Sequence, residues 1–244
     1  MSPLLLIVGL ITGTMIGTFG VGGVLLVPFL FYGLGVDLHI ATAMSSWSFL
    51  FTGIVGTITY SRSISWNIVA WLMIGIIPAA VLGARANVAL SSAILIPLLA
   101  ALILGSGLNT LLSRAEGERL LARLGRGSLV LLGVVTGFGS ALTGTGGPVL
   151  LVPMLMFMKI NALAAIAASQ VVQVPIALAA AIGFGLFGEI DLVSGTMLGV
   201  IQSFGVIVGA RVAHALKPEQ LRRFVALALI AVAILMISRI LIAK

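Results

Sequence analysis

The chain contains no cysteine and few charged residues. The absence of cysteine excludes disulfides, thiol redox chemistry and cysteine-based metal sites. Only 8% of its 244 residues are Asp, Glu, Lys or Arg, whereas a soluble domain usually carries about 25%. Because so few charges cannot build a polar shell around apolar helices, the composition excludes a soluble globular protein.

Charge is absent from long continuous stretches of the chain. Residues 40–60, 92–112, 128–158 and 163–187 contain no Asp, Glu, Lys, Arg or His. Each stretch approaches or exceeds the roughly 20 apolar residues that cross a bilayer as a helix. The net charge of +7 lies in short loops beside these stretches rather than along one amphipathic face. This pattern indicates an integral membrane protein and argues against a nucleic-acid binder.

The two halves of the chain carry the same motifs in the same order. Their offset stays between 124 and 126 residues, which favours internal duplication over chance. The glycine motif GVGG at 20–23 returns as GTGG at 144–147, and the second copy is followed by an additional proline, Pro148. The matching segments are Gly20–Pro28 with Gly144–Pro153, Ala41–Ser45 with Ala165–Ser169, and Gly83–Arg85 with Gly209–Arg211.

We expect an all-α polytopic membrane protein that consists of two repeats. The first repeat covers residues 1–112 and the second covers 128–244, joined by a basic linker over 113–127. Each repeat begins with a segment that glycines interrupt, a re-entrant or broken helix pair, and continues with three transmembrane helices. The interrupted segments are 4–33 and 128–158, and the spans are 40–60, 66–84, 92–112, 163–187, 192–210 and 224–242.

The basic residues indicate how the repeats are oriented. A re-entrant interrupted segment places ten Lys and Arg residues on the side of the linker and three on the other side. If the interrupted segment instead crosses the membrane once, seven Lys and Arg residues lie on the side of the linker and six lie on the other side. Because cytoplasmic loops carry the excess of Lys and Arg, we predict two inverted repeats with the linker in the cytoplasm and both termini outside it.

The two glycine motifs are the candidate binding site. Non-helical backbone inside a membrane occurs only where it is buried in protein or lines an aqueous cavity. Pro148 suits the first position of a new helix, because the N–H it lacks has no partner there. The free amides and positive dipole end of such a half-helix favour an anion, and paired interruptions mark the substrate sites of transporters. Close packing through small residues is the competing interpretation, and it fits Gly9, Gly13 and Gly17.

Polar side chains in the adjacent spans are further candidates. Hydroxyls and amides in membrane helices also serve as interhelical hydrogen-bond partners worth about 1 kcal/mol, but the recurrence of Ser45 at Ser169 favours that pair for binding. Thr18 and Ser48 are additional donors. The predicted substrate-binding residues are Gly20, Gly22, Gly23, Ser45, Ser46, Arg85, Thr143, Gly144, Thr145, Gly146, Gly147, Ser169, Gln170, Gln173, Gln202 and Arg211.

The charged side chains favour a site without a cofactor. Arg85 and Arg211 carry guanidinium groups that suit an oxyanion, but both lie toward a helix end, where extension to the lipid headgroups competes. We interpret His39 and His214 as solvated. All six acids lie outside the apolar spans, so we expect no carboxylate proton relay in the membrane and no metal or other cofactor.

The repeated motifs resemble those of the sulfite exporter TauE/SafE family of membrane anion permeases. The resemblance rests on GTFGVGGVLLVPFL, ATAMSS, GTGGPVLLVPML and the two GAR elements, and it extends over nearly the whole chain. It implies a multi-pass protein of the cell (inner) membrane that transports small sulfur-containing anions such as sulfite, sulfonates or sulfoacetate. Val21 stands where the second motif has Thr145, so we expect the first loop to contact the substrate less.

Three other functions stay open on the sequence. A passive anion channel would present the same donors. An intramembrane enzyme would need Ser140 and His214 as nucleophile and base, but Gly137–Ala141 lacks the last glycine of a nucleophile elbow and no HExxH motif occurs. An assembly subunit without a substrate leaves both interruptions unexplained.

The sequence does not choose the anion, the direction of transport or a coupling ion. Membrane lipid is an expected partner, and homo-oligomerisation stays open.

Overall fold

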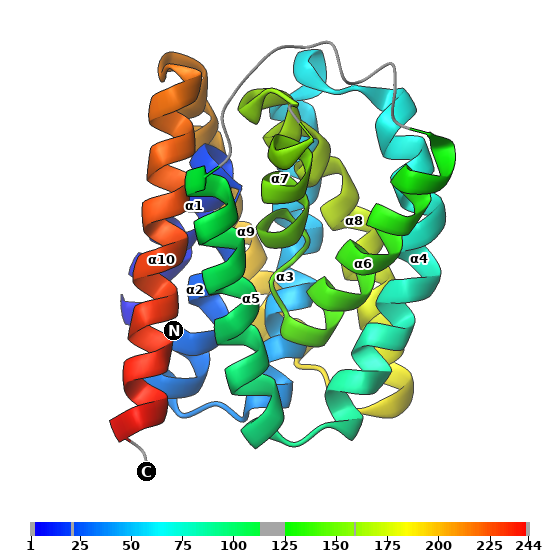
Figure 1. Cartoon of the computed structure of the whole chain (residues 1–244). Coiled ribbons are helices and arrows are strands. Elements are labelled where there is room, and N and C mark those ends of the chain that lie inside the picture. The colour runs from blue at the N-terminus through cyan, green and yellow to red at the C-terminus, as the bar shows by residue number, and fades with distance from the viewer. Residues whose placement is uncertain (1–2, 21, 113–124, 159, 243–244) are drawn as a thin grey trace.

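The described residues fold into a bundle of helices (Figure 1). The computed structural model describes residues 3–20, 22–112, 125–158 and 160–242, and these contain no strand. Val21, Lys159 and residues 113–124 of the predicted linker lie outside the described part. The helices are α1 (Pro3–Phe19), α2 (Gly23–Pro28), the π-helix η1 (Phe29–Gly33), α3 (Leu38–Thr59), the 3-10 helix η2 (Ser61–Ser63), α4 (Trp66–Ala89), α5 (Ser92–Leu112), α6 (Arg126–Thr143), α7 (Pro148–Phe157), α8 (Ala162–Phe187), α9 (Leu192–Ala215) and α10 (Pro218–Ile242).

The long helices have the length and composition of membrane spans. Helices α3, α4, α6, α8 and α9 are each long and apolar enough to cross a bilayer. Large apolar side chains on their outer faces are exposed, including Ile58 (69%), Leu131 (64%) and Val193 (68%). An apolar exterior of this extent suits lipid and not water. The predicted all-α polytopic membrane fold is therefore confirmed.

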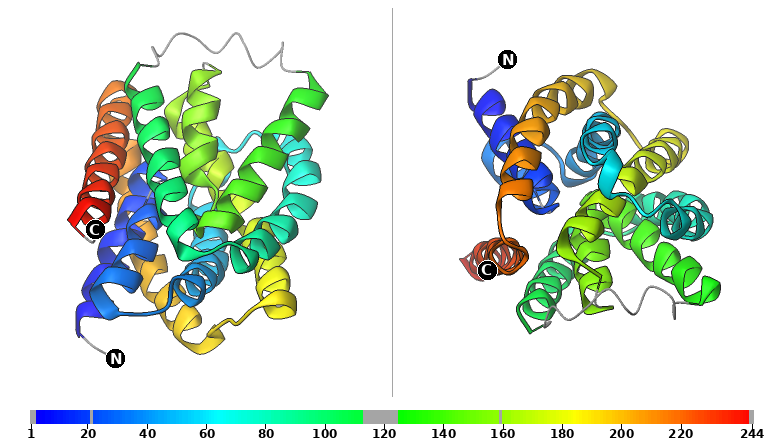
Figure 2. Two further views of the ribbon diagram at one scale, coloured as in Figure 1. Left: turned by 60° about the horizontal axis from the view of Figure 1, so that its bottom comes forward. Right: turned by 90° about the horizontal axis from the view of Figure 1, so that it is seen from above.

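Each interrupted segment turns back toward the end of the molecule from which it starts (Figures 1 and 2). Helix α6 runs inward from the end at which α3 and α5 finish, and α7 returns to that end. Helix α1 enters from the opposite end, and α2 with η1 returns there. Each segment therefore follows the path of a re-entrant pair and delivers a glycine loop to the interior.

The halves interlock through close helix contacts. Helix α1 packs along α9, α6 packs along α4, α3 packs against α8, and α5 packs against α10. Gly9, Gly13 and Gly17 of α1 face α9: a Cβ on Gly9 would lie 2.8 Å from the Ile201 side chain, and one on Gly13 would meet the backbone of Gln202. The packing role predicted for these three glycines is confirmed.

Side-chain caps begin α3, α8 and α9, the last through Asp191, which accepts a hydrogen bond from the backbone of Ser194 (2.9 Å). Asp37 accepts hydrogen bonds from the backbone of His39 (2.8 Å) at the start of α3. Asn161, at the repeat-related position, accepts one from Leu163 (2.8 Å) at the start of α8. Such caps pair amides that a helix leaves without partners. They fix where the helices that flank the two glycine loops begin.

Candidate functional site

The second glycine loop has a backbone that only glycine adopts without strain. Gly144, Gly146 and Gly147 have φ of +67°, +76° and +102°, values that side-chain-bearing residues rarely take. Helix α7 begins directly afterwards with Pro148 in its first turn, where the sequence predicts a helix start. The first loop contains one described glycine with positive φ, Gly20 at +75°. The second loop is thus the more contorted of the two.

The two loops lie against each other and against α3. A Cβ on Gly23, in the first half, would lie 2.8 Å from the carbonyl oxygen of Thr145 in the second. The same position on Gly23 is 2.6 Å from the ring of Phe49, and that ring also contacts Gly146. Both loops therefore need glycine for close approach, and they form one centre at the junction of the halves.

Side chains from neighbouring helices cover the carbonyl end of α6. Asn87 Nδ2 of α4 donates a hydrogen bond to the carbonyl oxygen of Leu142 (2.7 Å). Ser45 Oγ of α3 donates to the carbonyl oxygen of Gly144 (2.8 Å). These bonds pair carbonyl groups that the end of a helix leaves without an intrahelical donor.

The carbonyl end of α1 is covered in the same way. Gln170 Nε2 of α8 donates to the carbonyl oxygen of Ile16 (3.0 Å), and the hydroxyl of Tyr60 donates to that of Gly17. Both interrupted helices therefore end on carbonyl groups that are buried and paired. The negative ends of their dipoles are screened from the centre by protein donors.

The amide end of α7 is not covered. No described residue accepts a hydrogen bond from the backbone N–H of Gly146, Gly147 or Val149. Beside these amides lies Ser140 of α6, whose Oγ is 3.9 Å from the position of a Cβ on Gly147. Ser140 is fully buried and its hydroxyl has no hydrogen-bond partner. The start of α7 thus presents several unpaired donors inside the protein.

Thr143 and Thr145 form a polar pair within the same loop. Thr143 Oγ1 donates to the carbonyl oxygen of Gly139 (2.6 Å) and lies 3.0 Å from Thr145 Oγ1. Because the Thr143 proton is already used, Thr145 is the donor between the two hydroxyls. The two threonine hydroxyls are therefore used within the protein, and Ser140 of α6 is the hydroxyl beside this loop that has no hydrogen-bond partner among the described residues.

The repeat-related serines each adjoin the loop of the other half. Ser45 bonds to Gly144, whereas Ser169 Oγ is 3.5 Å from the Cβ position of Gly20 and donates to the carbonyl oxygen of Ile166 (2.7 Å). The structure therefore brings both serines to the centre. Each repeat contributes to the surroundings of both loops.

The predicted glutamines divide between the centre and the helix interfaces. Gln170 covers the end of α1, and its Oε1 has no partner. Gln173 Oε1 accepts from Thr52 of α3 (2.9 Å). Gln202 lies at the α1–α9 interface, where Nε2 donates to Thr12 (3.1 Å). Ser46 is buried with an unpartnered hydroxyl.

The arginines and histidines occupy the periphery. Arg85 and Arg211 are exposed, and the Arg85 guanidinium lies 5.3 Å from the centre of the Phe187 ring. His214 is also exposed, with its ring stacked on Tyr60. Ser140 Oγ has no hydrogen-bond partner among the described residues, so Ser140 and His214, the nucleophile and base considered for an enzyme, are not hydrogen-bonded to each other. His39 was predicted to be solvated but is half-buried against Asn87, because capping by Asp37 places it on the first turn of α3.

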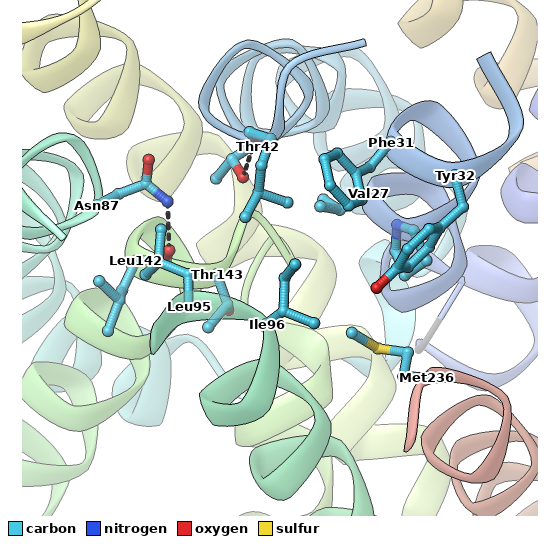
Figure 3. Close-up of a pocket in the computed structure, with 12 residues that line it drawn as sticks. Val27, Phe31, Tyr32, Thr42, Asn87, Leu95, Ile96, Leu142, Thr143 and Met236 are labelled. Atoms are coloured by element: carbon cyan, nitrogen blue, oxygen red, sulfur yellow. Dashed lines mark hydrogen bonds between the residues drawn. The ribbon is translucent and has the colours of Figure 1, made fainter. Parts of the chain in front are cut away.

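A narrow cavity adjoins the last residues of α6, directly before the second loop, on the side of the molecule at which α1 starts; Figure 3 shows the residues that line it. It lies among α2, η1, α3, α4, α5, α6 and α10, and its polar wall includes Thr42, Asn87 and Thr143. Its volume is about 10 Å³, roughly the room for one water molecule. At the other end, Leu151, Leu155 and Ile166 belong to a buried apolar cluster. Ser140 and the residues of the second loop are themselves buried in this conformation.

Sequence reasoning missed Ser140 as a binding residue, since it was considered only as an enzyme nucleophile, and it missed Asn87 and Tyr60 altogether. Asn87 lies beyond the predicted span 66–84, in the last turn of α4, and Tyr60 ends the predicted span 40–60. Each is a polar group at the edge of an apolar stretch in its half. A polar residue at the edge of an apolar stretch was the available signal. The carbonyl groups to which Asn87 and Tyr60 donate are far away in the sequence, and the spacing of motifs does not reveal them.

The apolar helices, the two interruptions and the buried polar centre define a polytopic membrane protein of the transporter class. The family model of the sulfite exporter TauE/SafE matches residues 5–236, and the chain belongs to this family. Membership implies, at the level of the family, transport of sulfur-containing anions across a membrane. No curated protein and no solved structure matches the chain.

Proposed function

We propose that the chain transports small sulfur-containing anions, such as sulfite, sulfonates or sulfoacetate-like compounds, and binds them at the start of α7. The observation that carries this proposal is the unequal covering of helix ends. The carbonyl ends of α1 and α6 are paired with side chains, whereas the amides of Gly146, Gly147 and Val149 at the start of α7 have no partner among the described residues. Buried amides without partners cost free energy, and an anion at a helix N-terminus offsets that cost.

The arrangement of the halves supports alternating access. We infer two inverted repeats in the cell (inner) membrane, with the basic loops in the cytoplasm and the anion between the repeats. The narrow cavity at one end and the apolar cluster at the other favour a carrier over an open channel. Counter-transport of labelled anion, which a passive channel does not perform, separates the two functions.

Ser140→Ala tests the site. Because the Ser140 hydroxyl has no partner, its removal leaves the stability of the fold unchanged or slightly raised. We expect the affinity for sulfite to fall about tenfold or more, since a hydrogen bond to a charged group contributes roughly 1.5–3 kcal/mol. The measurement is the shift of the unfolding midpoint of the detergent-purified protein with sulfite concentration.

Thr136→Val is the matched control. Thr136 is also buried on α6 with an unpartnered hydroxyl, but it lies one helical turn, about 6 Å, farther from the loop. We expect this variant to bind sulfite like the wild type. Equal affinities in both variants and the wild type would place the anion elsewhere.

A further inference from the structure

The buried polar groups of the described residues are all neutral. They are hydroxyls of Ser, Thr and Tyr60 and amides of Asn and Gln, such as Ser140, Thr145 and Gln170. The charged side chains whose burial the structure describes are exposed, namely Asp37, Arg62, Arg85, Arg126, Glu189, Asp191, Arg211, Lys217, Glu219 and Arg223. An anion at the start of α7 therefore meets dipoles and not a countercharge.

Two independent observations mark that position as a ligand site. The first is the unpaired amides of Gly146, Gly147 and Val149 at the start of a helix of 10 residues. The second is the fully buried, unpartnered hydroxyl of Ser140 beside Gly147. Together they offer hydrogen bonds and about half a positive elementary charge from the helix dipole.

The charge of the anion decides whether such a site can hold it. The cost of removing an ion from water rises with the square of its charge, while its attraction to fixed dipoles rises only in proportion to the charge. Neutral donors that offset the desolvation of a single charge therefore leave a double charge poorly compensated. A buried Arg or Lys would remove this restriction, and the described part of the site has none.

We propose that the site selects singly charged sulfur anions, namely hydrogen sulfite and sulfonates with one charge, and rejects sulfate, thiosulfate and fully ionised sulfite. Among the proposed substrates it therefore excludes sulfoacetate, whose carboxylate and sulfonate give it two charges. This inference rests on the proposed function and specifies the charge of its substrate. Hydrogen sulfite brings its own proton, so a pH-dependent affinity for sulfite needs no titrating carboxylate in the membrane.

The protein's own titratable groups must be separated from those of the substrate. His39 connects to the second loop through Asn87 and the carbonyl of Leu142. Tyr60 connects to the end of α1, and His214 stacks on its ring. Methanesulfonate stays singly charged throughout the accessible pH range, so any change in its affinity with pH reports these side chains alone.

The experiment measures affinities of the detergent-purified full chain for methanesulfonate, sulfate and sulfite by calorimetry, at pH values on both sides of the pKa of hydrogen sulfite. We expect sulfate to bind at least about 100-fold more weakly than methanesulfonate. The affinity for sulfite should fall about tenfold per pH unit above that pKa, while that for methanesulfonate stays constant.

Three outcomes count against the inference. Sulfate that binds as tightly as methanesulfonate shows that the site tolerates two charges. If the affinities for sulfite and methanesulfonate fall in parallel as the pH rises, a side chain of the protein titrates and the charge of the substrate does not explain the change. Both results leave the proposed function intact. If no sulfur anion binds at any pH, the proposed function fails, and this inference fails with it.

Discussion

Asn87 connects the surface of the protein to the candidate site. Its Nδ2 donates to the carbonyl of Leu142, and its Oδ1 lies 3.1 Å from Nδ1 of His39. Since Oδ1 can only accept, the histidine nitrogen is the donor of this bond. The chain of two hydrogen bonds fixes the end of α6 and, with it, the first residues of the second loop.

Asn87→Ala tests this role. We expect it to lower the free energy of unfolding by about 1–3 kcal/mol, because the buried carbonyl of Leu142 loses its donor. His39→Ala should cost less, since it removes only the outer hydrogen bond of a half-buried side chain. The unfolding midpoints of the two variants in detergent provide the comparison. If His39→Ala lowers the free energy of unfolding as much as Asn87→Ala or more, the hydrogen bond from Asn87 to Leu142 is not the stronger of the two.

The sequence predicted part of the site at this scale. It predicted the glycines of both loops, because GxGG followed by an apolar run is visible as a repeat, and it predicted Ser45 and Ser169 for the same reason. The structure brings these residues together, and their binding of substrate stays a prediction. The sequence did not anticipate the hydrogen-bond partners of Asn87 and Tyr60 or the unpartnered hydroxyl of Ser140. Whether a buried hydroxyl has a partner depends on helices from the other half, and one sequence carries no record of those contacts.

At the scale of elements, the two interrupted helices use the same packing device. Gly13 of α1 lies against the backbone of Gln202 in α9, and the repeat-related Gly137 of α6 lies against the backbone of Ile76 in α4. Each interrupted helix thus packs on a long helix from the other half. A side chain at either glycine must separate two backbones.

Gly13→Leu and Gly137→Leu should therefore destabilise the protein to a similar extent. We expect a loss of about 3 kcal/mol or more for each, since overpacking against backbone cannot be relieved by a rotamer change. Gly185→Leu is the control, because Gly185 is an exposed helical residue with open space around it. Thermal unfolding in detergent measures all three. A tolerated Gly137→Leu would show that the contacts of α4 with α6 are looser than those of α1 with α9.

The apolar runs predicted where helices occur better than they predicted the residues at which those helices end. The run at 163–187 corresponds to α8, which covers Ala162–Phe187, but the span 66–84 continues as a helix to Ala89. That last turn carries Arg85 and Asn87, whose polar side chains end the apolar pattern without ending the helix. Helix termini depend on caps and loops, whereas hydropathy reports only contact with lipid.

At the scale of the whole molecule, the predicted inverted orientation can be tested with single cysteines, because the chain has none of its own. The end of α3 and the starts of α6 and α8 lie at one end of the molecule, and the loops from α4 to α5 and from α8 to α9 lie at the other (Figure 1). By the helix bounds, Ser61, Ser128 and Asn161 belong to the first end, and Ser91 and Glu189 belong to the second. We expect impermeant thiol reagents to label the first three only from the cytoplasm and the last two only from outside. If the cysteines of Ser128→Cys and Asn161→Cys are labelled from opposite sides, the segment 128–158 crosses the membrane once.

The absence of charge from the described protein interior also has an electrical consequence. A carrier that encloses a singly charged anion among neutral groups brings no protein countercharge with it, so one negative charge crosses the membrane with each substrate. A membrane potential of about 100 mV, negative inside, contributes about 2.3 kcal/mol to outward movement of that charge. This equals a concentration ratio of roughly 50-fold. The resting voltage of the cell would then drive export of the anion without any coupling ion.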